Sequence, residues 1–240
     1  MAQYTDLFFD FDDTLYDTHG NALVALNEVY DIFHLEQYFN KRDTFINAYW
    51  LANMQLWAMY AEGKIERDYL MAERFRQPLS EGFTEDGARF QPSRKLCLDI
   101  NNVFLELNSQ KSGVVPGAHE TVKYLHNKGY KLHICSNGFP EVQYKKLKVC
   151  GLADYFNTVV LSYDAGANKP QKAFFDYAFR VTGAKPQTTL MIGDNYYTDI
   201  VGAQNAGIDT MFFNAKPSEF TAPTPVNYEI HSLTDISKIL

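Results

Sequence analysis

The order of apolar and polar positions predicts one short strand at the beginning of the chain. Residues 4–10, YTDLFFD, are mostly apolar and indicate a buried strand. Acidic residues follow at once in the run DFDDTLYDT. Acidic clusters usually belong to solvated loops, so a buried strand that ends in carboxylates needs a functional explanation.

The next stretch, from about residue 20 to residue 108, has helical periodicity and almost no strand signal. Trp50, Met54, Trp57 and Ala61 recur at helical spacing. We expect further helices over 65–77 and 84–108, with prolines as punctuation or first-turn residues. The Trp50, Met54 and Trp57 stripe is typical of a small aromatic core, and stacking on a nucleobase is the alternative.

From Pro116 onward, strand-like and helix-like segments alternate. The pattern predicts strands over 130–136, 157–162, 188–193 and 209–213, with a further candidate at 227–230. It predicts helices over 116–129, 140–150, 170–183, 196–207 and 232–239. Such alternation favours a parallel sheet with helices on both faces.

These elements predict an α/β protein with a Rossmann-like parallel sheet and an inserted α-helical domain. The first strand belongs with the later strands, although about a hundred residues separate it from the next one. We therefore assign 1–16 and 111–240 to the α/β core and 17–110 to a helical insertion.

The composition limits the partners and the cellular compartment that we expect for this protein. The chain has 240 residues, an apolar fraction of 46% and a net charge of −7, without a basic block, which argues against a nucleic-acid partner. The three cysteines cannot pair completely and are predicted to be reduced. Neither a basic leader nor an apolar run of roughly 20 residues is present. We expect a soluble cytoplasmic protein without a membrane partner.

Polar side chains follow several of the predicted strands at the point where each strand ends. They are Asp10 and Asp12, Ser136 and Asn137, Lys169, and Asp194. In an open parallel sheet, ligands bind outside the carboxyl ends of the strands. The sequence therefore predicts a site at this edge of the sheet.

The residue types at this edge favour phosphoryl chemistry. Three carboxylates, those of Asp10, Asp12 and Asp194, repel one another unless a cation neutralises them. An all-oxygen site suits Mg²⁺, which in turn attracts phosphate. Lys169 adds a fixed positive charge and Ser136 adds a donor. Such a group suits phosphoryl transfer, in which positioning and charge neutralisation dominate catalysis.

Four short motifs in this order resemble those of the haloacid dehalogenase-like hydrolase superfamily. They are Asp10-x-Asp12-x-Thr14, Ser136-Asn137-Gly138, Lys169-Pro170 and Gly193-Asp194-x-x-x-x-Asp199. The helical insertion after the first motif is similar to the cap of that superfamily. The resemblance spans essentially the whole chain.

The resemblance implies a role for each residue. Asp10 would be the nucleophile that forms an aspartyl-phosphate, and Asp12 would protonate the leaving oxygen and then activate water. Lys169 would act with them and, like Ser136 and Asn137, bind the phosphoryl group. Asp10, the Asp12 backbone carbonyl and Asp194 would hold Mg²⁺. Thr14 would hold the first loop at the substrate site, and Asp199 would orient the metal site from behind.

The same resemblance ranks the functions. Dehalogenases of the superfamily lack an aspartate at the position of Asp12, so phosphatase chemistry is favoured. The runs ICSNGF, LSYDAGANKPQKAFFDYAF and IGDNYYTDIVGAQNAGIDTMFFN resemble the pyrimidine 5′-nucleotidase group. The predicted substrate is a small phosphorylated metabolite, a pyrimidine nucleoside monophosphate, handled by a monomer or homodimer. The alternatives are a sugar phosphate or phosphoglycolate phosphatase, a phosphomutase, and a non-catalytic binding module.

Overall fold

The computed structural model describes residues 4–240, which form two compact units. The core unit comprises the chain up to Thr18 and from Ser112 to Leu240, and the helical unit comprises His19–Lys111. The boundaries expected from the sequence, 16/17 and 110/111, lie within two residues of these. The role of the helical unit as a cap remains a prediction.

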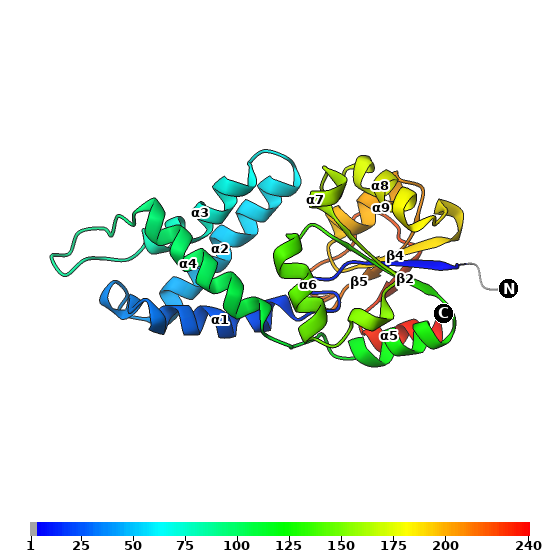
Figure 1. Cartoon of the computed structure of the whole chain (residues 1–240), viewed down its shortest axis with the longest axis horizontal. Helices are drawn as coiled ribbons and strands as arrows, with labels where there is room; N and C mark the ends of the chain where they lie inside the picture. Colours follow the sequence, from blue (N-terminus) through cyan, green and yellow to red (C-terminus); the bar gives the residue numbers. More distant parts are fainter. Residues whose placement is uncertain (1–3) are drawn as a thin grey trace. The chain divides into compact units, whose positions relative to one another are not determined.

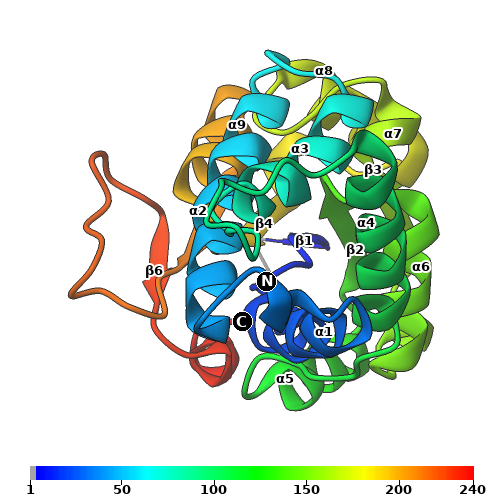
Figure 2. The ribbon, with the colours of Figure 1, turned by 90° about the vertical axis from the view of Figure 1, so that its left-hand side faces the viewer.

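The core unit contains a six-stranded sheet in which every neighbouring pair of strands is parallel. The strand order is β3-β2-β1-β4-β5-β6. The strands are β1 (Asp6–Phe9), β2 (Lys131–Ser136), β3 (Thr158–Leu161), β4 (Thr189–Gly193), β5 (Asp209–Phe213) and β6 (Tyr228–Ile230). Figure 2 shows β6 at the outer edge, after a long connection drawn in orange. The predicted Rossmann-like parallel sheet is confirmed.

Alternate residues of the strands enter two separate hydrophobic clusters, one on each face of the sheet. Leu7 and Phe9 of β1 lie in one cluster, and Phe8 lies in the other. Successive side chains of a strand point to opposite faces, so a strand buried on both faces is apolar throughout. This explains the continuous run LFF of β1, which occupies the centre of the sheet between β2 and β4.

Helices cover both faces of this sheet. Figure 1 shows α5 on one side and α8 with α9 on the other. The α-helices of the core unit are α5 (Ala118–Asn127), α6 (Pro140–Val149), α7 (Ser162–Ala165), α8 (Lys172–Thr182) and α9 (Gly202–Asn205). Shorter helical turns are η2 (Ala153–Tyr155), η3 (Pro186–Thr188) and η5 (Leu233–Lys238), and η4 (Tyr196–Val201) is a π-helix.

The single helix that we predicted over 196–207 is therefore two elements. The residues of η4 form wider turns than an α-helix, and α9 continues the chain after it. A π-helix often occurs at a functional site. Its place directly after β4 makes η4 part of the edge where the polar residues collect.

The helical unit consists of α1 (Thr18–Ile32), η1 (Leu35–Gln37), α2 (Arg42–Ala61), α3 (Arg67–Leu79) and α4 (Arg94–Ser109). Its own hydrophobic cluster joins residues from all four α-helices, among them Leu26, Tyr49, Phe75 and Phe104. The unit therefore has a core of its own, separate from the two clusters on the sheet.

Two predictions within the helical unit were wrong. Residues 84–93 are not helical, because Pro92 disfavours helix before it and Ser93 caps α4 by accepting a bond from the Leu96 N–H. The aromatic stripe is not a uniform core face either. Trp50 is partly buried and stacks on the ring of His19, whereas Met54 is 65% exposed.

Within residues 4–240, no helix is both long enough and apolar enough to cross a membrane.

Candidate active site

The polar residues predicted from the sequence lie in the core unit, at or just beyond the carboxyl ends of β1, β2 and β4 and in the connection from β3 to α8. Asp10 directly follows β1, and its backbone N–H donates to the Ile192 carbonyl at 2.9 Å, which continues the sheet by one residue. The Asp10 side chain is buried. The central strand therefore fixes the position of Asp10.

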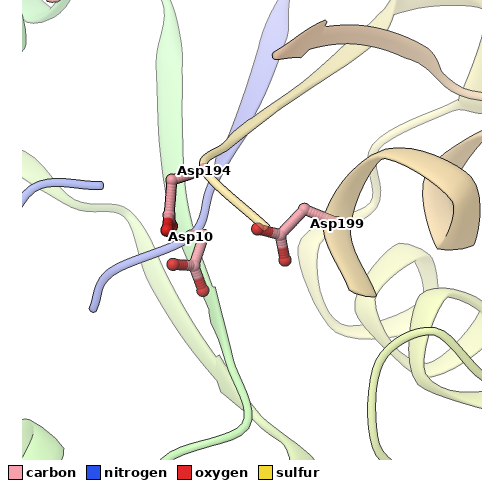
Figure 3. A group of neighbouring side chains, drawn as sticks. All are labelled: Asp10, Asp194 and Asp199. Carbon is pink, nitrogen blue, oxygen red and sulfur yellow. The ribbon is translucent and has the colours of Figure 1, made fainter. Parts of the chain in front are cut away.

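Three carboxylates meet at this edge. Asp10, Asp194 and Asp199 each offer an oxygen within 4.8 Å of the others, and Figure 3 shows their carboxylates turned toward a common space. Asp10 directly follows β1, Asp194 directly follows β4, and Asp199 lies in η4. Asp10 and Asp194 lie together as the strand-end argument predicted, but the third carboxylate of the group is that of Asp199 and not that of Asp12.

Lys169 supplies the positive charge for this group. Its Nζ donates to Asp10 Oδ1 at 2.6 Å and to Asp199 Oδ1 at 2.7 Å, and the side chain is 98% buried. A buried charge is tolerated only when it is paired and hydrogen-bonded. The ammonium therefore stabilises two carboxylates that would otherwise be buried without compensation.

Burial and mutual repulsion change the titration of this group. Burial is the largest cause that raises the pKa of Asp10, to about 7, although the Lys169 ammonium opposes it. Burial, followed by the charges of Asp10 and Asp199, raises the pKa of Asp194 well above its usual range. For Lys169, burial acts against the charged form, but Asp10 and Asp199 outweigh it and raise its pKa. When all three carboxylates are ionised the group has more negative than positive charge, and this repulsion adds to burial in raising the pKa values of Asp10 and Asp194.

Two further predicted residues hold the loops of the site. The Thr14 hydroxyl donates to Asp194 Oδ1 at 2.8 Å and accepts from the Asp194 N–H at 3.0 Å. The Asn137 amide accepts from the Lys169 N–H at 2.8 Å and donates to the Lys169 carbonyl at 3.0 Å. Thr14 thus links the loop after β1 to the loop after β4, and Asn137 fixes the backbone that carries Lys169.

The π-helix η4 determines the position of Asp199. Asn195 caps it by accepting from the N–H groups of Tyr197 and Thr198. The Asn195 N–H donates to Asp199 Oδ2 at 3.0 Å, and Asp199 is fully buried. A Cβ on Gly193 would lie 2.3 Å from Asp199 Oδ2, so only glycine allows this approach.

Asp12 belongs to a different set of contacts. Its Oδ1 accepts from Lys146 Nζ and from the Thr18 hydroxyl, both at 2.7 Å, and its Oδ2 accepts from Gln143 Nε2 at 2.6 Å. Burial raises the pKa of Asp12, but the Lys146 ammonium and these hydrogen bonds outweigh it and lower the pKa. The carboxylate is therefore held in its ionised form.

Sequence reasoning missed Gln143 and Lys146. Both lie on α6 and are buried, and they are three residues apart, so they share one face of the helix. The sequence did contain a signal for them, because both polar residues lie on the helix face where an amphipathic helix normally buries apolar residues. Lys146 Nζ also lies 4.7 Å from the centre of the Tyr16 ring, and this cation–π contact stabilises the Lys146 ammonium.

A family model described as haloacid dehalogenase-like hydrolase matches residues 7–207. The chain belongs to this family. It is 32% identical over 242 residues to YfnB of Bacillus subtilis, and the alignment covers 100% of this chain and 97% of YfnB. The crystal structure of YfnB bound to magnesium superposes with a TM-score of 0.84 at 29% identity, over 99% of each chain.

Two relatives of this hydrolase are named for their substrates. The pyrimidine 5′-nucleotidase PynA of Streptococcus pneumoniae is 29% identical over 235 residues, covering 97% of this chain and 93% of PynA. The pyrimidine 5′-nucleotidase YjjG of Escherichia coli is 28% identical over 235 residues, covering 98% and 96%. The resemblance stated from the motifs is confirmed, and the chain is an enzyme of the haloacid dehalogenase type, in a group that includes nucleotidases.

Replacement of Lys169 tests its part in this buried charge group. Lys169→Met leaves Asp10 and Asp199 buried without their cation, so we expect the free energy of unfolding at neutral pH to fall by about 3–5 kcal/mol. The loss should shrink as pH falls, because protonation neutralises the carboxylates. Urea denaturation curves at several pH values measure both effects.

Lys172→Met is the matched control, because Lys172 pairs with Asp176 on the exposed face of α8. An exposed pair of this kind contributes about 1 kcal/mol or less. Equal losses in the two variants would contradict the role given to Lys169.

Proposed function

We propose that this protein is a Mg²⁺-dependent phosphomonoesterase that acts through an aspartyl-phosphate on Asp10, with pyrimidine nucleoside 5′-monophosphates as its substrates. The observation that carries the proposal is the acidic group of Asp10, Asp194 and Asp199 with Lys169 beside it. A phosphoryl group needs both a nucleophile and compensating positive charge, and this edge of the sheet offers both.

The donor atoms fit a hard cation. Carboxylate oxygens are the ligands that Mg²⁺ prefers, and the three carboxyl groups outnumber the one ammonium of Lys169, so a bound cation would favour their ionised forms. In the proposal Asp10, the Asp12 backbone carbonyl and Asp194 hold the metal, and Asp199 supports it from behind. Bound there, Mg²⁺ would neutralise charge on the phosphoryl oxygens.

In the first proposed step, a carboxylate oxygen of Asp10 attacks phosphorus and the bond from phosphorus to the leaving oxygen breaks. Asp12 gives a proton to that oxygen, and the free nucleoside leaves. Lys169 favours the ionised form of Asp10 against the effect of burial and neutralises charge on the phosphoryl group. The Ser136 hydroxyl and the loop fixed by Asn137 bind phosphoryl oxygens.

In the second proposed step, Asp12 takes a proton from water, and the oxygen of that water attacks the phosphorus of the aspartyl-phosphate. The bond between phosphorus and the Asp10 oxygen breaks, which releases inorganic phosphate and restores the enzyme. The ionised form of Asp12 that Lys146 favours is the one that accepts this proton. Charge arriving with the substrate phosphate raises the pKa of Asp12 and helps it to carry a proton in the first step.

The substrate class rests on the relatives. Two pyrimidine 5′-nucleotidases match nearly the whole chain, including the helical unit that we propose as the cap. The presence of Asp12 supports a phosphatase over a dehalogenase, because halide departure needs no proton donor. Sugar phosphates and phosphoglycolate are the competing substrates in the experiment that follows.

The first experiment measures phosphate release from UMP, dUMP, dTMP, purine nucleotides, sugar phosphates and phosphoglycolate, with Mg²⁺ and with EDTA. We expect preference for the pyrimidine nucleotides, and loss of activity in EDTA. Asp10→Asn should reduce turnover by at least about 10³-fold, because the amide cannot form the aspartyl-phosphate. Asp176→Asn, an exposed change on α8, is the control.

Each other outcome has a defined meaning. Activity on sugar phosphates alone would keep the chemistry and discard the nucleotidase proposal. Transfer of phosphate to a second position of a sugar would indicate a phosphomutase. Appreciable turnover by Asp10→Asn would remove Asp10 as the nucleophile, and no activity of the wild type would favour a binding module.

Metal binding can be tested without activity. Mg²⁺ at about 100 times its dissociation constant should stabilise the wild type by about 2.7 kcal/mol. Asp194→Asn should lose this stabilisation, yet should be no less stable than the wild type in EDTA, because it removes one of three crowded carboxylates. Thermal unfolding with and without Mg²⁺ measures both. An undiminished Mg²⁺ effect in Asp194→Asn would contradict the proposed ligand set.

A further inference from the structure

We propose that Gln143 is a positioning residue that connects the phosphoryl-binding hydroxyl of Ser136 with the carboxylate of Asp12 and holds both in the orientations that the reaction uses. The inference rests on the function proposed above and adds a residue that lies outside the four sequence motifs.

The contacts of Gln143 define this connection. Its Nε2 donates to Asp12 Oδ2 and to Ser136 Oγ, each at 2.6 Å, from a side chain that is 98% buried. A side-chain amide has two hydrogens on nitrogen, so both are used. The Gln143 nitrogen therefore links Asp12, in the loop after β1, to Ser136, at the end of β2.

The chemistry of the partner fixes the orientation of the amide. An ionised carboxylate only accepts hydrogen bonds, so the NH₂ group must face Asp12. Gln143 Oε1 is then buried, and it has no hydrogen-bond partner among residues 4–240. A buried acceptor without a partner costs about 1–3 kcal/mol. This cost offsets part of the stabilisation from the two hydrogen bonds of Nε2, so the chief effect of the amide is to orient its two partners.

The same amide directs the hydroxyl of Ser136. Ser136 Oγ accepts from Gln143 Nε2 at 2.6 Å and from the Gly138 N–H at 3.0 Å. A hydroxyl has two acceptor lone pairs and one hydrogen. Both lone pairs are occupied, so the hydrogen is left to donate, and a phosphoryl oxygen is an acceptor. Gln143 thus turns Ser136 into a donor.

The glycine of the Ser136-Asn137-Gly138 motif makes room for this side chain. A Cβ on Gly138 would lie 2.2 Å from Gln143 Nε2 and 2.4 Å from its Cδ. Gly138 does not have a positive φ, so backbone conformation does not require glycine. Space for Gln143 explains the residue, and the two positions depend on each other.

Loss of the amide should affect proton delivery more than it affects folding. Without Gln143, Asp12 Oδ1 keeps Lys146 and Thr18, but Oδ2 loses its hydrogen bond and the carboxylate can turn. A misplaced Asp12 protonates the leaving oxygen poorly. The effect should therefore depend on how strongly the leaving group needs a proton.

The test compares two substrates of similar shape, phenyl phosphate and p-nitrophenyl phosphate, in the full-length Mg²⁺-loaded enzyme. Phenolate is the more basic leaving group and needs the proton, whereas p-nitrophenolate leaves without it. For Gln143→Leu we expect kcat/KM to fall about 10²-fold for phenyl phosphate, and at least about tenfold less for p-nitrophenyl phosphate. The ratio kcat/KM reports the steps through formation of the aspartyl-phosphate, in which the leaving group departs.

Two more variants make the result specific. Gly138→Ala should give the same selective loss, because its Cβ displaces the Gln143 amide. Tyr144→Leu, an exposed change on the same helix, should leave both substrates unaffected. Equal losses for the two substrates in Gln143→Leu, or no loss, would overturn the inference.

The same assays separate this inference from the proposed function. If the wild type is active and Asp10→Asn is inactive, but Gln143→Leu affects both substrates equally, only the role of Gln143 fails. If the wild type hydrolyses neither the nucleotides nor the aryl phosphates, or if Asp10→Asn is as active as the wild type, both proposals fail together.

Discussion

The Lys169 ammonium lies between two buried carboxylates, and the remainder of the site depends on this contact. Asp10 and Asp199 come from different parts of the chain, and each would be costly to bury alone. Lys169 makes their approach favourable, whereas burial and the charges of Asp10 and Asp199 raise the pKa of Asp194. The cost of ionising this third carboxylate is the physical reason to expect a cation, and with it a phosphoryl group, at the carboxyl end of the sheet.

The surrounding structure keeps this charge group apart from Asp12, the residue that we propose transfers the proton. Asn137 fixes the Lys169 backbone, Thr14 ties Asp194 to the first loop, and η4 brings Asp199 beside Gly193. Asp12 faces Lys146 and Gln143 of α6 instead. Two carboxylates two residues apart in the sequence therefore have opposite pKa shifts, because burial raises the pKa of Asp10 while the Lys146 ammonium and hydrogen bonds lower that of Asp12.

The sequence predicted the strands well because each is a short apolar run followed by polar residues, and strand ends in a parallel sheet share one edge. For the same reason it predicted that Asp10 and Asp194 lie together, but it placed the Asp12 carboxylate with them, where the structure has that of Asp199. The prediction failed at residues 84–93, where Pro92 and the Ser93 cap outweigh the helical periodicity. It also failed at η4, because π-helical hydrogen bonding does not change the order of apolar and polar residues. Gln143 was missed because a glutamine on a helix is usually exposed, and its position on the buried face of α6 was the signal that it is not.

The most direct test of the account is to trap the covalent intermediate. The enzyme is mixed with UMP labelled with ³²P at its phosphate, quenched in acid during turnover and reduced with borohydride, and its peptides are mapped by mass. The account predicts ³²P on acid-quenched protein and, after reduction, conversion of Asp10 to homoserine, with neither signal in Asp10→Asn. Turnover without any covalent label, or with the label on another residue, would contradict it.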